Sequence, residues 1–330
     1  MQRSSLLLLF AVLLVSCGND DDGTTPDPQS ETPTVQSTST YDVLLEEDLT
    51  YGEGLSHTTI NSAETTTMPL KLDVYVPDND SQNRPAYLFI HGGGFTGGSK
   101  QAAAIINLAN YYTSRGWVFI SIDYRVSRDK GTVPQAWLDY AEILPEENVA
   151  QYLAIYPAQR DAKAAMRWLM ANAKTYNINT DYITVGGGSA GAITAITVGV
   201  SSPEDFRDEL SGTDDPTLTS TNLDQSYNVH TIINHWGSKV ALDALETVYG
   251  LNRFDADDPP LFIAHGTDDP TVLFSSALEL ETIYQANQVP YVFYPFEGLG
   301  HGIWNATADG KRLEELAFEF IIEQQGLKVE

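Results

Sequence analysis

The chain has 330 residues and is 42% hydrophobic, so it is long enough for one large α/β domain or two ordinary ones with a substantial core. Its 45 acidic residues outnumber 18 basic ones, and the formal net charge is −27. This negative charge repels phosphate backbones and anionic lipid surfaces, which argues against nucleic-acid binding. We interpret the excess acid as a solvated surface, with adaptation to a saline medium as the alternative.

The first sixteen residues have the pattern of a secretory signal peptide. Arg3 supplies a positive charge, and the apolar run Leu6 to Val15 is far shorter than the ~20 residues that a membrane-spanning helix needs. The run leads into residues 14–17 (LVSC), which resemble the lipobox of bacterial lipoproteins. In that family the signal is cut before the cysteine, which is then acylated. The resemblance implies a lipid anchor at Cys17 and an exported protein held at the outer membrane, on its periplasmic or cell-surface side.

After the signal peptide, the sequence predicts a tether followed by one folded domain. Cys17 is the only cysteine, so the body can form no disulfide and offers no cysteine nucleophile or thiolate metal site. Residues 18–40 are rich in Asp, Thr, Ser and Pro with almost nothing apolar, which predicts a disordered tether over residues 17–40. Residues 41–330 contain no internal repeat and no linker, so we predict a single domain there.

From residue 41 onward, short apolar runs alternate with helical patterns, which predicts a mostly parallel central sheet with helices on both faces. Residues 71–76 alternate in polarity as an antiparallel edge strand does. Buried central strands are predicted for the continuous apolar runs at 86–90, 117–122, 182–185, 231–233, 261–264 and 291–294. Helices are predicted at 101–114, 161–174, 276–287 and 311–324.

The segment 127–157 interrupts this rhythm, because connections within an α/β unit are normally much shorter. It carries Trp137, Tyr140, Tyr152 and Tyr156, which make it too apolar for a solvated loop. We therefore predict an inserted, lid-like segment that borders a substrate pocket.

The sequence Gly187-Gly188-Ser189-Ala190-Gly191 matches the pattern G-x-S-x-G. It follows the strand predicted at 182–185 and opens a run of small residues compatible with a helix. A strand-to-helix turn this tight presents the serine Oγ above the sheet edge, as a nucleophile requires. The alternative is an ordinary glycine-rich turn.

A second glycine-rich motif, His91-Gly92-Gly93-Gly94-Phe95, follows the strand predicted at 86–90. Its glycines let the backbone turn N–H groups towards a ligand, as a site of acyl transfer requires where negative charge develops. A phosphate-binding loop is the alternative, but no lysine stands at the required spacing. We interpret His91 as a structural residue that orders the turn.

Together these motifs resemble the HGGG type of α/β-hydrolases, the group that contains hormone-sensitive-lipase-like and feruloyl or acetyl-xylan esterases. Residues 123–125 (DYR), 156–158 (YPA) and Asp161 fall in the same order, and the similarity spans residues 65–325. The resemblance implies an oxyanion hole formed by the backbone N–H groups of Gly93, Gly94 and Ala190. Gly188 and Ala192 depart from the lipase-like branch and favour the feruloyl or acetyl-esterase branch.

In α/β-hydrolases the triad follows the chain order Ser, Asp, His. The strand predicted at 261–264 is followed by residues 265–269 (HGTDD), and the family pattern H-G-T-x-D aligns Asp269 as the acid. Asp268 is the alternative acid. Of the six histidines, only His301 follows this point, and it is the predicted base.

The sequence therefore predicts a serine carboxylic-ester hydrolase that works through Ser189, Asp269, His301 and an acyl-enzyme. Its expected substrates are short-chain, acetyl or feruloyl-type esters outside the cell, either small or borne on a polymer. A serine peptidase or amidase and a non-catalytic binding protein on the same fold are the alternatives. No cofactor or metal site is predicted, and membrane contact is expected only through the anchor at Cys17. The candidate pocket residues are aromatic: Phe95, Trp137, Tyr156, Trp236 and Trp304.

Overall fold

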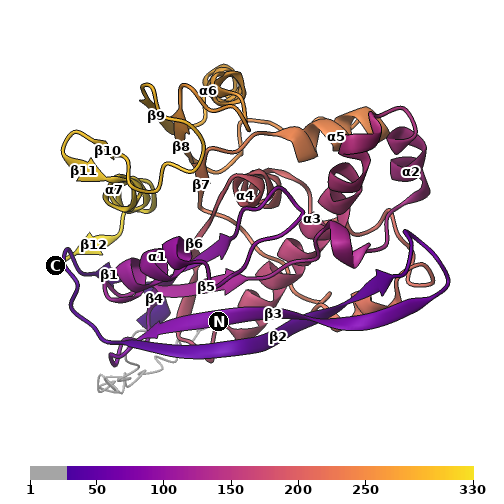
Figure 1. The fold of residues 1–330 in the computed structure, drawn as a ribbon. Helices are drawn as coiled ribbons and strands as arrows, with labels where there is room; N and C mark the ends of the chain where they lie inside the picture. The colour runs from indigo at the N-terminus through magenta and orange to yellow at the C-terminus, as the bar shows by residue number, and fades with distance from the viewer. Residues whose placement is uncertain (1–27) are drawn as a thin grey trace, which may run out of the picture.

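The computed structural model describes residues 28–330, so the predicted signal peptide and the lipidation site Cys17 lie outside the described residues. Within this part, a central sheet is formed by β2 (Val43–His57), β3 (Thr65–Pro77), β4 (Arg84–Ile90), β5 (Val118–Ile122), β6 (Ile178–Gly188), β7 (Thr231–His235), β8 (Leu261–Gly266) and β9 (Tyr291–Phe296). The spatial order is β2-β3-β5-β4-β6-β7-β8-β9 (Figure 1). The pairs β2–β3 and β3–β5 are antiparallel and all others are parallel, which confirms the predicted mostly parallel sheet.

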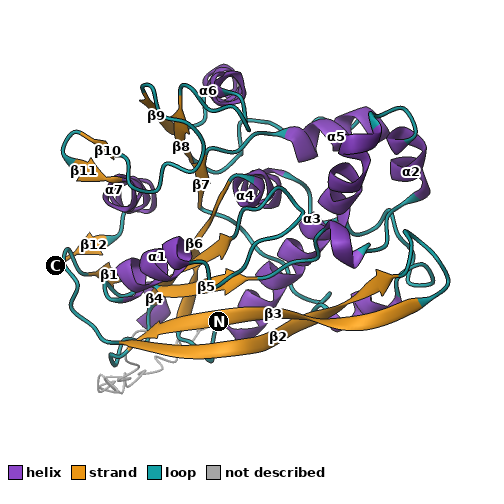
Figure 2. Ribbon diagram, in the orientation of Figure 1, coloured by secondary structure: helices purple, strands orange, loops and turns teal. Residues whose placement is uncertain are grey.

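Helices cover both faces of the sheet (Figure 2). They are α1 (Ala103–Thr113), α2 (Gln135–Ala141), α3 (Glu146–Asn172), α4 (Ala190–Val200), α5 (Val240–Tyr249), α6 (Phe274–Asn287) and α7 (Leu313–Gln325). Successive side chains of a strand point to opposite faces, so Tyr87 and Phe89 of β4 join the core under α1 and α7, whereas Leu88 and Ile90 join the core under α3 to α6. Among residues 28–330, no helix has both the length and the apolar content to cross a bilayer.

The edge of the sheet differs from the prediction. The segment 71–76 is antiparallel as expected, but it lies in β3, and β2 covers it as the outermost strand. The sequence of β2 does not alternate regularly, because its pairing shifts between Glu46 and Leu49 and again between Thr50 and Gly52. Such bulges move side chains to the opposite face and remove the period of two that predicts a strand. At the other end, β9 is an edge strand rather than a central one.

The predicted tether is wrong for residues 29–40, because this segment packs on the domain. The short strand β1 (Thr34–Val35) pairs in parallel with β12 (Lys328–Val329), and Val35 is fully buried. The Gln36 N–H donates to the Arg115 carbonyl at 2.9 Å. Backbone pairing of this kind does not depend on composition, so the scarcity of apolar residues gave no sign of it.

The segment 127–157 is helical and continuous with the domain. It contains α2 and the first part of α3. The sequence predicts that this helix begins near Asp161, but it begins at Glu146 and continues through Pro157. An internal proline removes a helical hydrogen bond, which is why the sequence favoured a later start. Trp137 and Tyr156 are fully buried in the core, so their assignment to the pocket wall is wrong. Movement of this segment as a lid stays a prediction.

A buried ion pair joins α3 to the loop after β5. The Arg125 guanidinium and the Asp161 carboxylate are each 1% exposed, and the Nη2 to Oδ1 distance is 2.7 Å. Removing one partner leaves the other charge buried, so we expect Asp161→Ala to lower the free energy of unfolding by about 3–5 kcal/mol. Urea denaturation measures this change. The matched control is Asp208→Ala, which breaks an exposed pair with Arg207 and should cost less than about 1 kcal/mol; equal losses would contradict the prediction.

A half-buried carboxyl in the loop before β8 makes stability depend on pH. Burial, with the charges of Asp255 and Asp257, raises the pKa of Asp258 from its ordinary 3.8 to about 7. The folded state therefore holds this proton more tightly, and stability present below pH 3.8 is lost as the pH rises towards 7. We expect Asp258→Asn to raise Tm at pH 8 but not at pH 4. An exposed control, Asp224→Asn, should show no such difference, and an equal gain at both pH values would contradict the prediction.

Candidate active site

Ser189 lies between the end of β6 and the start of α4, in a backbone conformation that residues other than glycine rarely adopt. Its φ is 55° and its ψ is −122°. Crowding around the turn fixes this conformation: a Cβ on Gly191 would lie 1.9 Å from the Ile90 carbonyl oxygen, and one on Gly187 would lie 2.2 Å from the Gly191 carbonyl carbon. Only glycine fits at these positions, and the strained turn lifts the Ser189 Oγ above the carboxyl ends of the strands.

Asp269 follows β8 and is 4% exposed. Its Oδ1 accepts the backbone N–H groups of Thr271 at 2.8 Å and Val272 at 3.0 Å. Its Oδ2 faces His301, whose Nδ1 lies 2.7 Å away. Asp268, the alternative acid, is exposed and makes no such contact within residues 28–330. The structure therefore brings Asp269 rather than Asp268 to the histidine.

His301 lies in the loop after β9 and reaches across the sheet edge. Its Nε2 is 2.9 Å from the Ser189 Oγ. Gly298 and Gly302 flank it with φ values of 69° and 79°, a region that favours glycine and lets the loop turn sharply. The structure thus places Ser189, His301 and Asp269 in one continuous line of hydrogen bonds.

His265 packs against the loop that follows β8 and carries Asp269. It is fully buried, and its Nε2 lies 2.8 Å from the Val272 carbonyl and 3.4 Å from the Asp269 Oδ2. Burial lowers its pKa, which favours a neutral ring. Because a carbonyl oxygen can only accept, the contact with Val272 requires the ring proton on Nε2. The bond to Val272 holds the turn whose N–H groups orient Asp269.

The three glycines after β4 form a turn beside Ser189. Gly93 and Gly94 have φ values of 117° and 60°, and a Cβ on Gly93 would lie 2.2 Å from the Gly97 oxygen. Among the described residues, the backbone N–H groups of Gly93, Gly94 and Ala190 donate to no protein acceptor. These free donors suit an oxygen that gains negative charge.

Gln151 of α3 braces this turn and was missed at the sequence level. Its Nε2 donates to the Gly94 carbonyl at 2.8 Å. An amide on a helix belongs to no recognisable motif, so only the packing of α3 against the glycine turn reveals its role. His91 is structural as predicted: it is buried, stacks on Tyr124 at 4.3 Å, and burial lowers its pKa.

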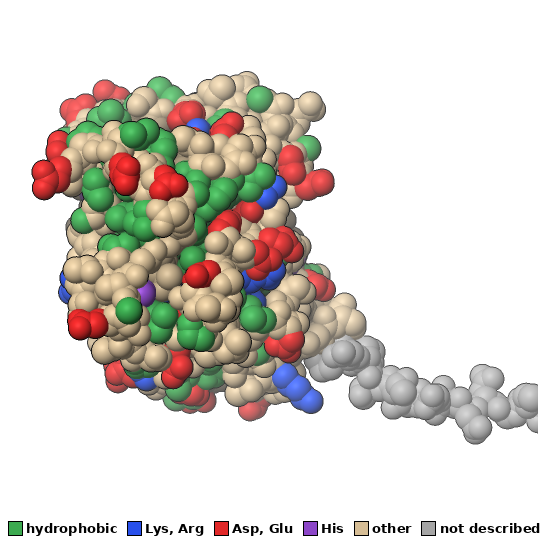
Figure 3. Space-filling model, turned by 90° about the vertical axis from the view of Figure 1, so that its right-hand side faces the viewer, with side chains coloured by type: hydrophobic (Ala, Val, Ile, Leu, Met, Phe, Trp, Pro, Cys, Tyr) green, Lys and Arg blue, Asp and Glu red, His purple; other side chains and the backbone are tan. Residues whose placement is uncertain are grey.

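Ser189 lines two cavities. The first has a volume of about 530 Å³ and is largely apolar, with Phe95, Leu144, Ile155, Ile193, Val240 and Leu273 among its lining residues. Figure 3 shows hydrophobic side chains gathered across the middle of the face that carries α2 and α5, with acidic side chains around them. The second cavity, of about 420 Å³, is lined by the glycine turn, Trp236, His301 and Trp304. Phe95, Trp236 and Trp304 therefore do line the site.

No group of three or more His, Cys, Asp and Glu side chains between residues 28 and 330 is arranged to hold a metal ion. The aspartates of residues 255–258 hydrogen-bond to backbone N–H groups of their own turn: Asp258 accepts from Asp255, and Asp255 from Asp257.

The sheet order, the strained serine turn and the facing histidine define an α/β-hydrolase. The sequence model of the BD-FAE family matches residues 72–152 and 137–243, together more than half of the chain. The chain belongs to the BD-FAE family.

Known relatives and solved structures agree with this class. The esterase LipC of Mycobacterium tuberculosis is 23% identical over 251 residues, which cover 68% of this chain and 54% of LipC. Venom carboxylesterase-6 of Apis mellifera is 29% identical over 124 residues, covering 37% of this chain and 19% of that protein. The chain thus spans about half the length of LipC and less of the second relative.

Solved structures of esterase 2 from Thermogutta terrifontis share the fold. The form phosphorylated by paraoxon has a TM-score of 0.56 and 25% identity, covering 82% of this chain and 94% of that one. The butyrate-bound form has a TM-score of 0.57 and 24% identity, covering 78% and 90%.

Proposed function

We propose that this protein is a serine carboxylesterase with Ser189 as nucleophile, His301 as general base and Asp269 as the acid that orients it. The observation that carries the proposal is the line of hydrogen bonds from the Ser189 Oγ through the His301 ring to the Asp269 carboxylate, at 2.9 and 2.7 Å. The phosphorylation of a similar esterase by paraoxon is in keeping with it.

The reaction follows from these positions. His301 Nε2 takes the Ser189 proton as Oγ attacks the ester carbonyl, and Asp269 holds the ring with its other proton on Nδ1. The N–H groups of Gly93, Gly94 and Ala190 stabilise the oxyanion of the tetrahedral intermediate. His301 then donates its proton to the departing alcohol oxygen, and water hydrolyses the acyl-enzyme by the same steps in reverse order.

The two cavities divide the substrate between them. The departing oxygen must face His301, so the alcohol part lies in the cavity that His301 and Trp304 line. The acyl part then lies in the apolar cavity beside Ala190 and Ile193, whose volume accepts an acetyl or an aromatic feruloyl group. These dimensions support short-chain, acetyl or feruloyl-type esters as substrates.

The test compares esters with amides and maps the nucleophile. We expect the protein to hydrolyse p-nitrophenyl acetate and methyl ferulate, and to hydrolyse a peptide p-nitroanilide far more slowly. Paraoxon should inactivate it, with the phosphoryl adduct found on the Ser189 peptide by mass spectrometry. Faster anilide hydrolysis would favour the peptidase alternative, and absence of both hydrolysis and adduct would favour a binding protein.

We also propose that the enzyme is an exported lipoprotein acylated at Cys17, on the basis of the signal-like residues 1–16 and the lipobox-like residues 14–17. Cys17→Ala should move the enzyme from the membrane fraction to the soluble fraction of its native host. An unchanged distribution would contradict the anchor.

A further inference from the structure

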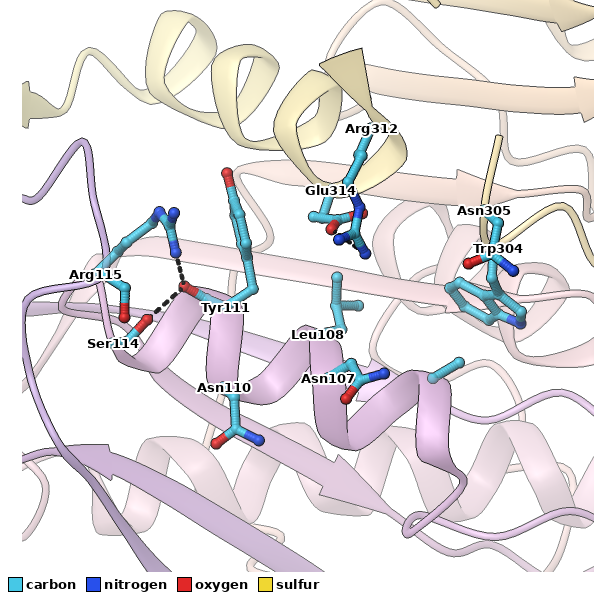
Figure 4. A pocket seen from close by; sticks show the side chains of 12 residues that line it. Asn107, Leu108, Asn110, Tyr111, Ser114, Arg115, Trp304, Asn305, Arg312 and Glu314 are labelled. Carbon is cyan, nitrogen blue, oxygen red and sulfur yellow. Dashed lines mark hydrogen bonds and ion pairs between the residues drawn. The ribbon is translucent and has the colours of Figure 1, made fainter. Parts of the chain in front are cut away.

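The two cavities that Ser189 lines have different surroundings. The cavity beside His301 shares Ala104 and Trp304 with a groove of about 690 Å³ between α1 and α7 (Figure 4). The alcohol side of the proposed site therefore continues into this groove. The apolar cavity that receives the acyl part, which we call the acyl cavity, instead meets a cluster of charged side chains.

This cluster joins α5 to α6. Among the described residues that line the acyl cavity, only Lys239, Asp243 and Glu279 carry a charge. Lys239 Nζ lies 3.0 Å from the Glu279 Oε1 and also pairs with Asp243, four residues further along the chain. Lys239 directly precedes α5, Asp243 lies in α5 and Glu279 lies in α6, so we call these three side chains the α5–α6 bridge.

The bridge is charged at neutral pH. Partial burial opposes the charge of Lys239, but its hydrogen bonds to Asp243 and Glu279 outweigh this effect and raise the pKa of the ammonium group. One positive and two negative charges therefore stand together at the wall of a cavity that is otherwise largely apolar.

The bridge lies at the end of the acyl cavity that is farther from the catalytic residues. The lining residues Leu273, Ser276 and Glu279 recur every three residues along α6, directly after the turn whose N–H groups hold Asp269. At 1.5 Å per residue, Glu279 lies about 9 Å beyond Leu273 along the helix. An acyl chain that extends from Ser189 along α6 therefore reaches the bridge last.

A smaller cavity of about 220 Å³ has the same bridge in its wall. Lys239 and Asp243 line both this cavity and the acyl cavity. Leu242, Phe254 and Ile283 also line the smaller cavity, so apolar surface is present beyond the bridge. The bridge therefore separates two spaces that a longer acyl chain would otherwise fill together.

Contact between an apolar chain and the bridge is unfavourable. The side chains of Asp243 and Glu279 are 44% and 52% exposed, so water reaches these carboxylates. Methylene groups placed against them displace that water and offer no hydrogen bond in return. Closer to Ser189, where Ile155 and Ile193 line the cavity, each methylene group instead gains free energy by burial.

We propose that the α5–α6 bridge limits the length of the apolar acyl chain that the enzyme accepts. The inference rests on the proposed esterase function and deepens it, because it assigns acyl selectivity to three residues outside the catalytic line of hydrogen bonds. Acyl groups that end before the bridge react well, and longer alkanoyl groups react more slowly.

The experiment removes the bridge in two ways. Lys239→Ala with Asp243→Ala trims the two side chains that line both cavities. Lys239→Met with Asp243→Leu replaces the same charges by apolar side chains of similar bulk, and it serves as the second test if the trimmed variant does not fold. The matched control, Lys311→Ala with Glu319→Ala, removes an ion pair whose residues line neither cavity.

Each protein is assayed on p-nitrophenyl esters from acetate to octanoate, which share one alcohol, and its Tm is measured to verify folding. In the wild type, kcat/KM should fall as the acyl chain grows towards octanoate. We expect both bridge variants to raise the octanoate-to-acetate ratio of kcat/KM by about tenfold, the gain from burying about two more methylene groups. The control should keep the ratio of the wild type.

Esters that differ only in the alcohol separate the two sides of the site. The ratio of kcat/KM on octyl acetate to that on ethyl acetate should be the same in the bridge variants and the wild type, because the alcohol lies beside His301 and Trp304. A change of this ratio as large as that of the acyl series would overturn the proposal.

Unchanged octanoate-to-acetate ratios in the folded bridge variants would also overturn the proposal, as would a wild type that prefers octanoate to acetate. Each of these results leaves the esterase function intact. A wild type that hydrolyses none of the esters would instead contradict the esterase function.

Discussion

Ser189→Ala is expected to lower kcat on p-nitrophenyl acetate by about 10⁶, the scale found when serine proteases lose their nucleophile. The methyl group that replaces the hydroxyl can neither attack the carbonyl nor donate a proton to His301 Nε2, which lies 2.9 Å from the Ser189 Oγ in the wild type. A residual rate above that of water should persist, because the N–H donors of the glycine turn are unchanged. Initial rates with active-site titration of the wild type measure the change.

Ser238→Ala is the matched control, because Ser238 lines the acyl cavity without contacting His301. We expect its rate to stay within a few-fold of the wild type and the Tm of both variants to be similar. Substantial turnover by Ser189→Ala, with its folding intact, would remove Ser189 as the nucleophile.

Asp269→Asn is expected to lower kcat/KM by about 10⁴, as the corresponding change does in serine proteases. In the wild type, Oδ1 accepts two backbone N–H groups and Oδ2 faces His301 Nδ1. The new amide keeps its oxygen on the two N–H groups and turns its NH₂ towards Nδ1. The His301 ring then carries its proton on Nε2, so this nitrogen can no longer accept the Ser189 proton.

The control is Asp268→Asn, one residue away and exposed. An exposed substitution of this kind changes free energies by about 0.5 kcal/mol or less, so its kcat/KM should stay within about twofold of the wild type. Equal losses for the two variants would mean that the charge of the loop matters, rather than the orientation of His301. A larger loss for Asp268→Asn would make Asp268 the acid.

The inserted segment shows where local patterns mislead. Trp137 and Tyr156 were expected in the pocket because a long aromatic segment near an active site usually lines it. Instead Trp137 stacks on Tyr152 at 4.8 Å, and Tyr156 extends to the Glu209 carboxylate. Which face of a helix meets the core depends on its neighbours, and no property of the segment itself carries that information.

The sequence by itself determined the class of fold and the candidates for chemistry. Buried parallel strands require continuous apolar runs, and a nucleophile on a strained turn requires glycines around Ser189, so both leave a local signature. Only the tertiary structure shows that Asp269 rather than Asp268 lies against His301, that Gln151 meets the glycine turn, and that a groove lies between α1 and α7. These features join residues tens to hundreds of positions apart, and they depend on distances that exist only once the helices have packed on the sheet.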